Sequence, residues 1–427
     1  MTATMLPPQP AGAPPAGTPP TPSRAAETLV IVGSVVAPLN LLIAASLTVY
    51  DVFIGLALIL LLTERRRLPL PPRGYVVAAF VFLITALLSA FRATYPFEAL
   101  TQVLQYVFIF FVQIPVILAV IRTRKAVILS MALMCLGTLL AILHSHITHQ
   151  TQGAGRAVVF YSENPNRLGY PAAYLLPILI ALWVCADQMW RRRRWLFAVL
   201  VAGSFYLAIW ALAASASRSS ALGAALALIV FVVLRPGVGP GRMLLRAVAL
   251  AAAVTAAIFL LASTGQLPST LEDRVERSFS SDTQDNEHLV RDRENLADAG
   301  MRAFFDSPYL GTGLDNFRYV AVDYDLNATP QLPHNLWLQF MVQVGIFGTL
   351  AIALIFLLWF RDVVGAHKRA GPMDRLLIWS LVSSMVGILA IFMFAPEMLD
   401  RHYYLLFGLG LAMVRGLADK ETWEGRG

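Results

Sequence analysis

Long uninterrupted apolar runs restrict the fold of this chain more than any other feature of its sequence. VVAAFVFLITALLSA (76–90) and LGAALALIVFVVL (222–234) contain no charged residue. A helix that crosses a bilayer needs about 20 mostly apolar residues, so runs of this kind are typical of membrane spans. Charged residues make up 14% of the chain, against about 25% in soluble domains. These observations predict an all-α, polytopic membrane protein.

The apolar runs, and the breakers that separate them, predict about twelve spans. Pro38 and Asn40 interrupt the first two, whose limits are therefore the hardest to set. The predicted spans cover 27–44, 47–63, 75–91, 97–120, 126–147, 169–188, 195–213, 219–234, 245–263, 335–360, 375–395 and 402–415.

The basic residues predict which side of the membrane each loop faces. Of the 33 Lys and Arg residues, 22 fall in alternate short loops and in the two tails, and the tetrad 191–194 is the densest group. Short loops rich in Lys and Arg remain cytoplasmic, so both termini are expected in the cytoplasm. This distribution explains the net charge of +7. Because no basic stripe is interleaved with aromatics, nucleic acid is not an expected partner.

This topology predicts one large outward-facing loop, which is the first place to look for an active site. It carries thirteen acidic residues against six basic ones. The predicted organisation begins with a disordered, Pro- and Ala-rich cytoplasmic tail (1–26) and spans one to nine (27–263). The outward loop (264–334), with its helices and active-site residues, comes next. Spans ten to twelve (335–415) and a second cytoplasmic tail (416–427) follow it.

The outward loop contains a predicted helix, EHLVRDRENLADAGMRAFF (287–305). Arg291, Asp298 and Arg302 are seven and four residues apart, which puts them on one stripe of that helix. One interpretation is a solvated face with an ordinary surface ion pair. The other is a pair of guanidinium groups presented to an anion.

Three further residues on the outward side are candidates. Arg218 lies in ASASRSSALG between two apolar runs, where a charged side chain is costly and usually functional. Arg156 lies in the loop before the sixth span, and it could equally be an ordinary loop residue. His334 precedes an apolar run in PHNLW. Arginine suits phosphate oxygens and histidine can accept a proton near neutral pH, so this set predicts an anionic, phosphate-bearing ligand.

No metal site or cofactor is predicted. Asp323 and Asp325 form a D-x-D pair that could hold a divalent metal, but this pattern is common by chance. No Gly-x-Ser-x-Gly turn is present, so serine nucleophile chemistry has little support.

Four segments of the chain together resemble one family. They are GRAVVFYSENPNRLGY, ASRSSALG, RDRENLADAGMRAFFDSPYLGTGLDNF and PHNLWLQFMVQVGIFG, and they cover most of residues 150–350. In their order and outward placement they are similar to the O-antigen ligase and polymerase superfamily of bacterial envelope enzymes. Relatives often carry an acidic residue where this chain has Gln343.

The resemblance implies a C-type glycosyltransferase-like fold in the bacterial inner membrane with a periplasmic active site. It implies transfer of a glycan from undecaprenyl pyrophosphate to the lipid A-core oligosaccharide, without a metal. His334 is the expected base, and Arg218 and Arg291 are the expected catalytic arginines. The expected partners include the membrane lipid around the protein. The expected substrate-binding residues are Arg156, Arg302 and Asn335.

Two alternatives stay open at this stage. A polymerase of O-antigen or exopolysaccharide would use the same donor, and the single large outward loop favours a ligase over it. A polysaccharide or lipid transporter would also have many spans and charged cavities, but it usually shows internal repeats. We find no such repeat in the sequence.

Overall fold

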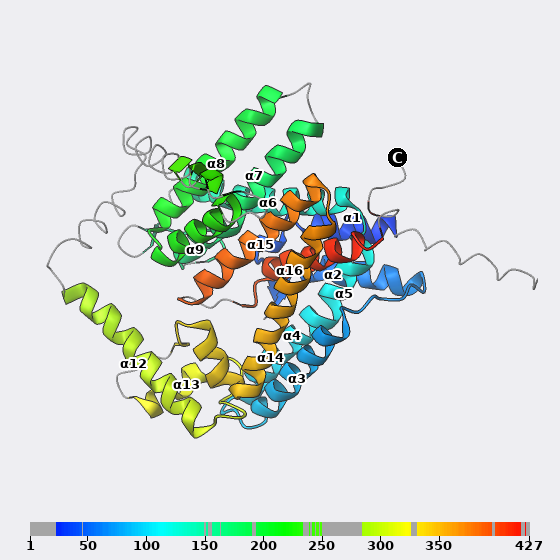
Figure 1. Ribbon diagram of the computed structural model, residues 1–427. Helices are drawn as coiled ribbons and strands as arrows, with labels where there is room; N and C mark the ends of the chain where they lie inside the picture. The colour runs from blue at the N-terminus through cyan, green and yellow to red at the C-terminus, as the bar shows by residue number, and fades with distance from the viewer. Residues whose placement is uncertain are drawn as a thin grey trace, which may run out of the picture.

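The computed structural model describes the following parts of the chain: residues 23–44, 46–148, 151–152, 156–162, 164–189, 194–233, short pieces between 239 and 249, 284–325, 331–394, 398–419 and residue 423. It is mostly helical, at 79% helix, which confirms the predicted class. Figure 1 shows a bundle of long helices, with α12 and α13 lying at one end of it.

The helices before the outward loop are α1 (Arg24–Gly33), α2 (Val49–Thr63), α3 (Arg73–Ala90), α4 (Pro96–Phe108), α5 (Ile114–Val120), α6 (Arg124–Thr148), α7 (Asn166–Met189), α8 (Arg194–Ser215) and α9 (Arg218–Leu228). Within and after the loop come α12 (Gln284–Asp306), α13 (Phe317–Tyr324), α14 (Leu336–Ala366), α15 (Pro372–Phe392) and α16 (Arg401–Gly416). Two short antiparallel ribbons join helices, β1 (Leu42–Ala44) with β2 (Leu47–Thr48) and β3 (Thr151–Gln152) with β4 (Arg156–Ala157).

Six helical segments of the described chain are long and apolar enough to cross a membrane, and three shorter apolar helices accompany them. A multi-pass membrane protein is therefore confirmed, whereas the number twelve is not. The six are Arg73–Ala90, Pro96–Val120, Arg124–Thr148, Asn166–Ala186, Leu336–Arg369 and Pro372–Phe392.

The first predicted span is wrong as a single helix. α1 ends at Gly33, and a 3-10 turn at Ala37–Leu39 and the β1–β2 ribbon follow it. Pro38 restricts the backbone there, and Asn40 adopts a left-handed conformation with φ 45°. These are the residues that made the limits of this span uncertain. The predicted ninth span, 245–263, lies almost wholly outside the described residues.

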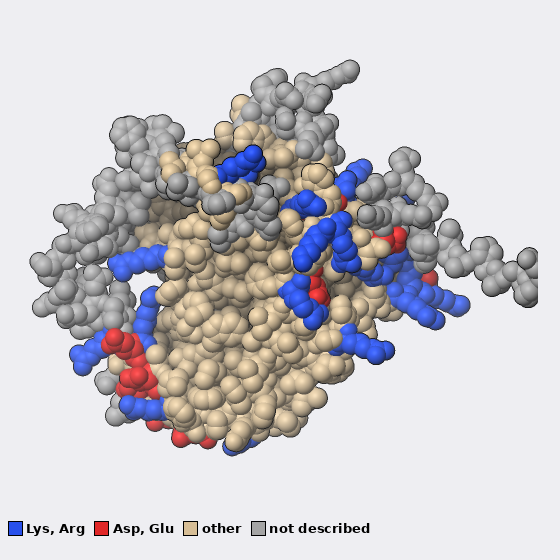
Figure 2. All heavy atoms as spheres, viewed as in Figure 1, with Lys and Arg blue, Asp and Glu red and all other residues tan. Residues whose placement is uncertain are grey.

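Charged side chains gather at the two ends of the bundle. Figure 2 shows one concentration of Lys and Arg, a broad surface with almost no charge, and a mixed acidic and basic group at the other end. Such a belt is what a bilayer requires, since a charge in hydrocarbon is costly. The side of the membrane that each end faces stays a prediction, and we call the α12–α13 end the outward end.

Helix α14 is broken at Gly345, where φ is 68°. The piece after the break, 346–366, has enough residues to cross a bilayer by itself, at about 1.5 Å of rise per residue. The piece before the break, 336–344, is called the half-helix below. The predicted span at 335–360 therefore contains two helices with different surroundings.

The break is filled by the chain that follows α12. Thr312 donates its backbone N–H to the carbonyl of Val342 at 2.8 Å, and Gly313 donates to Gln343 at 3.0 Å. On the far side of the break, Ile346 donates to the carbonyl of Pro308 at 2.8 Å. The carbonyls and amides that the broken helix leaves without partners are thus satisfied by the outward loop.

The half-helix is held at both of its ends by spanning helices. At its start, the Asn335 side chain donates to the carbonyl of Met393, directly after α15, at 3.4 Å. Near its end, the Ser89 hydroxyl on the last turn of α3 donates to the carbonyl of Gln343 at 2.6 Å. The outward ends of α15 and α3 therefore fix its position.

The half-helix also forms a small core with the loop helices. Leu296, Ala299, Phe317 and Val342 are buried together there, separate from the main core of the bundle. The loop helices are therefore packed against the start of α14.

Candidate functional site

His334 stands two residues before the half-helix and is partly buried. Its Nε2 lies 3.3 Å from Oε1 of Gln331. When Nε2–H donates to that oxygen, Nδ1 holds the lone pair that can accept a proton. The imidazole is thus oriented by a neighbour while one ring nitrogen stays basic.

The surroundings of His334 lower the pKa of its imidazole below the ordinary value of 6.5. Burial is the larger cause, and the positive charge of Arg293 is the second. Both effects disfavour the imidazolium form and so favour the neutral ring. A neutral imidazole is the form that accepts a proton.

Arg293 was missed by the sequence analysis, which singled out Arg291 instead. Arg293 and Gly300 are seven residues apart on α12, and a Cβ at Gly300 would contact the side chains of Leu338 and Val342 on the half-helix. Positions seven apart share a helix face. The spacing to the small residue Gly300 was therefore the available signal for Arg293, the arginine whose charge acts on His334.

Arg291 and Arg302 are both exposed on α12. The guanidinium of Arg302 donates to the carbonyl of Tyr324 on α13 at 3.0 Å. This contact gives Arg302 a structural role, because it joins the two loop helices. Its predicted role in substrate binding stays a prediction, as does the predicted role of Arg291.

Asn335 is the N-cap of the half-helix. Its Oδ1 accepts hydrogen bonds from the backbone N–H groups of Trp337 and Leu338, at 3.0 and 3.1 Å. Its amide nitrogen donates to Met393, as described above. The side chain is thus engaged in starting the helix that orients His334, and its predicted contact with substrate stays untested.

Arg218 begins α9, directly after the tight turn that follows α8. Ala216 in that turn has a positive φ of 45°, and Ser217 caps α9 through a hydrogen bond from the Ser220 N–H at 3.3 Å. The Arg218 side chain is exposed. A cation at a helix N-terminus opposes the helix dipole, whereas an anion there is favoured. That Arg218 binds an anion there stays a prediction.

Small residues bring the Arg218 turn close to its neighbours. A Cβ at Gly169 of α7 would overlap the hydroxyls of Ser215 and Ser220, and Gly223 of α9 lies against the carbonyl of Gly387 on α15. Arg218 and His334 are thus connected to the same helix. Arg218 begins α9, which packs against the outward half of α15 at Gly387. His334 precedes Asn335, which bonds to Met393 just after α15 ends.

Arg156 lies in β4, where it is paired with Gln152 of β3. This ribbon belongs to the link between α6 and α7, and the Ser145 hydroxyl of α6 donates to the nearby carbonyl of Val158 at 2.6 Å. The structure describes the backbone of Arg156 but not the position of its side chain. Its predicted binding role stays a prediction.

Arg167, on the first turn of α7, is a further cation that the sequence analysis did not select. Its guanidinium lies 3.7 Å from Asp400, which also accepts a hydrogen bond from Asn40 at 3.1 Å. The pair connects α7 with the start of α16. Arg167 lies two residues before Gly169, which contacts the turn that precedes Arg218, so this ion pair is also at the outward end.

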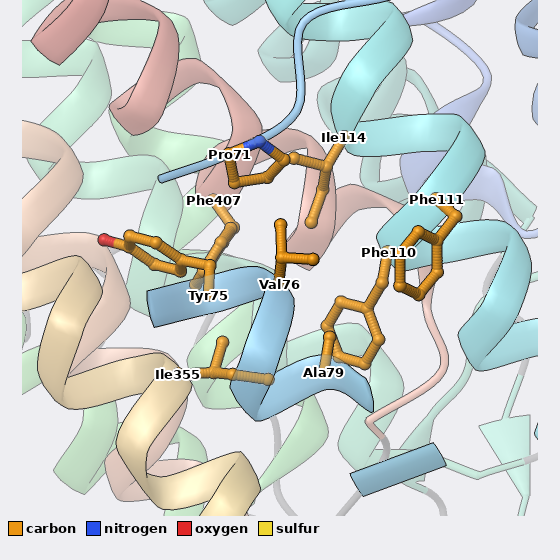
Figure 3. Close-up of a pocket in the computed structure, with 9 residues that line it drawn as sticks. All are labelled: Pro71, Tyr75, Val76, Ala79, Phe110, Phe111, Ile114, Ile355 and Phe407. Carbon is orange, nitrogen blue, oxygen red and sulfur yellow. The ribbon is translucent and has the colours of Figure 1, made fainter. Parts of the chain in front are cut away.

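Two cavities lie among the spanning helices, away from these candidates. One has a volume of about 20 Å³, room for little more than one water. Figure 3 shows the residues that line it, with the Tyr75 hydroxyl turned away, where it donates to Asp362 at 3.1 Å. The other is an open apolar groove between α3 and α4, bounded by Leu83, Leu87, Val103 and neighbours.

Within the described residues, no three His, Cys, Asp or Glu side chains come together in a way that could hold a metal ion. Asp323 lies exposed on the last turn of α13, and Asp325 follows that helix as its C-cap. Whether this pair has a metal-binding role is left to experiment.

The fold and the outward end define a multi-pass helical membrane protein that presents several arginines and a neutral histidine on one face. Residues 203–353 match the model of the family described as O-antigen ligase, which assigns this segment to that family and confirms the resemblance. The match indicates a function of the O-antigen ligase and polymerase type, a glycosyltransferase-like activity. No curated protein matches the chain.

Proposed function

We propose that this protein is an O-antigen ligase, which transfers a glycan from undecaprenyl pyrophosphate to the lipid A-core oligosaccharide at the periplasmic face of the inner membrane. One observation carries the proposal: the segment that matches the family, 203–353, contains Arg218, Arg291 and His334. Arg156 and Arg167 lie outside that segment. The proposed chemistry therefore rests on the first three.

The proposed reaction is a single displacement. The acceptor hydroxyl oxygen attacks the anomeric carbon, and the bond from that carbon to the pyrophosphate oxygen breaks. The electron pair of that bond stays on the leaving pyrophosphate, and the hydroxyl proton passes to His334. One displacement inverts the anomeric centre. The lowered pKa of His334 supports its role as the base.

Arg218 and Arg291 are proposed to bind the pyrophosphate and to stabilise the charge that develops on it. Both side chains are exposed at the outward end, and guanidinium groups remain charged at any working pH. Arg293, whose positive charge acts on His334, is proposed to add to the positive charge around the base. The arginines would then serve in place of a metal.

Transfer by purified protein in detergent or nanodiscs tests the proposal. Wild-type protein, undecaprenyl-pyrophosphate glycan and lipid A-core should yield the joined product, and His334→Ala should yield none while it is inserted normally. Product from the His334→Ala protein would overturn the base assignment. Activity that is lost on chelation and restored by manganese would contradict the metal-free reaction and favour Asp323 and Asp325.

A deletion strain separates the proposed ligase from the alternatives. Loss of a ligase leaves the lipid A-core bare while polymer accumulates on its carrier. Loss of a polymerase instead leaves cores that carry single repeat units. Movement of donor lipid across a bilayer without product would identify a transporter.

A further inference from the structure

The loop helix α12 has a second apolar face, which is exposed in the described part of the chain. Its packed face consists of Leu296, Ala299 and Ala303, which are buried. Met301 and Phe305 lie on another side of the helix and are exposed, Phe305 at 69%. Tyr309, just past the end of the helix, is 63% exposed. Large apolar side chains grouped on a surface mark a contact with a partner or a membrane.

This face continues the surface of α14 that faces lipid. The Tyr309 ring stacks on the Phe347 ring, with centroids 5.9 Å apart and planes inclined by 20°. Phe347 is the second residue after the break in α14. It heads a stripe of exposed apolar side chains on the spanning piece, Phe347, Leu350, Leu354 and Leu357. The apolar surface therefore passes from the span onto the loop without a gap.

The depth of Tyr309 is fixed by the backbone. Its neighbour Pro308 accepts the hydrogen bond from Ile346, the first residue of the spanning piece. A Cβ at Gly345 would overlap the Tyr309 carbonyl, so the two segments are in direct contact. Tyr309 thus stands at the outward end of the span, where the bilayer hydrocarbon ends.

Other aromatic residues stand at the same end of neighbouring helices. Phe91 and Phe97, which flank the corner between α3 and α4, are exposed, as is Tyr95 between them. Aromatic side chains are enriched at the interface between lipid and water. The α3–α4 corner and the Phe305–Tyr309 segment therefore mark one interfacial level on two sides of the half-helix.

We propose that the last turn of α12 and Tyr309 insert into the outer leaflet, so that α12 lies on the membrane surface rather than projecting away from it. Figure 1 shows α12 lying across the outward end of the bundle and not along the spanning helices. The occupant of the face is the lipid at the boundary between headgroups and acyl chains.

Insertion depends on apolar contact and not on lipid charge. The exposed ionic side chains around the face are Glu294, Asp298, Arg302 and Asp306, of which three are acidic and one is basic. Such a face gains little from anionic headgroups, whereas buried apolar area does favour binding. Neutral and anionic bilayers should therefore hold it equally well.

Depth-dependent quenching in nanodiscs tests this proposal on the whole protein. Phe305→Cys and Asp298→Cys are labelled with the same environment-sensitive fluorophore. The native Cys135 and Cys185 are buried, so the introduced cysteine takes the label. Asp298 lies seven residues before Phe305, on the same side of α12 but two turns farther from Tyr309, so it is the control for a position before the inserted turn. Leu354→Cys is the control for a position within the bilayer.

We expect the label at 305 to be quenched severalfold more by headgroup-proximal spin-labelled lipid than the label at 298. The order should reverse with aqueous iodide, and both results should be equal in neutral and anionic nanodiscs. Iodide quenching at 305 as strong as that of the free fluorophore in solution would overturn the proposal. Insertion only in anionic lipid would overturn the apolar mechanism. The readout needs no glycan transfer, so it stands apart from the proposed function.

Discussion

Arg401 and Asp51 form a two-point ion pair within the helix bundle: Arg401 Nε lies 2.7 Å from Oδ1 of Asp51, and Arg401 Nη2 lies 3.1 Å from Oδ2. Both residues are buried, and Arg401 donates further to the carbonyl of Leu399. Asp51 also closes a capping box with Thr48 at the start of α2. The pair therefore joins the outward ends of α2 and α16.

Removal of one partner of this pair should destabilise the protein by about 3–5 kcal/mol, because it leaves a buried charge without its counter-ion. Arg401→Leu and Asp51→Leu are each expected to lower the thermal unfolding midpoint in detergent. The double variant should recover part of the loss. A double variant as unstable as the sum of the single ones would show that the pairing itself contributes little.

The acidic limb of the pH–rate profile should depend on Arg293. His334 must be neutral to accept a proton, so transfer is expected to fall as the pH drops through its lowered pKa, below 6.5. Arg293→Gln removes a cation that lowers this pKa, and the limb should then move to higher pH.

Arg291→Gln is the matched control for this shift, since Arg291 lies two residues away on the same helix. It should reduce the rate without moving the limb. An unchanged limb in Arg293→Gln would mean that burial alone sets the pKa of His334.

Gly345→Ala should disrupt the junction between α14 and the loop. Gly345 has a φ of 68°, and a Cβ there would overlap the Tyr309 carbonyl. Strain of this kind costs on the order of 1–3 kcal/mol before the overlap is counted. Gly365→Ala is the control, since a Cβ at Gly365 meets nothing within 4 Å. Thermal unfolding should show a large loss for the first variant and little change for the second.

Arg218→Gln should lower transfer by roughly a hundredfold or more, the range seen when one donor to a developing oxyanion is removed. The side chain is exposed, so the amount of folded protein should not change. Arg92→Gln, an exposed arginine after α3, is the control and should keep its activity. Equal activity in both variants would remove Arg218 from the proposed site.

Most spanning helices could be predicted because one physical signal, a long apolar run, decides them. The predicted spans 75–91, 126–147 and 375–395 agree with α3, α6 and α15 to within three residues at each end. The same signal predicted a span at 27–44 that is not a single helix. The run is apolar enough for a span, but Pro38 and Asn40 turn the chain there. Local backbone restrictions prevailed over hydrophobicity there.

The arrangement at the outward end was harder to predict, because contacts between distant residues decide it. Gly345 reads as an ordinary residue of an apolar run, and only its contact with Tyr309 explains the break. Helical spacing placed Arg291, Asp298 and Arg302 on one stripe, yet it could not tell which face of α12 meets the half-helix. Arg293, on that other face, was missed for this reason.

The two hydrogen bonds that brace the half-helix, from Asn335 to Met393 and from Ser89 to Gln343, have a consequence for substrate range. If His334 is the base, as we propose, it precedes a helix that is fixed at both ends, so we expect it to keep one position. Acceptor sugars of different shape would then have to bring their hydroxyl to that position. Any adaptation to a new glycan is then expected in the surrounding loops, while Asn335 and Ser89 stay as they are.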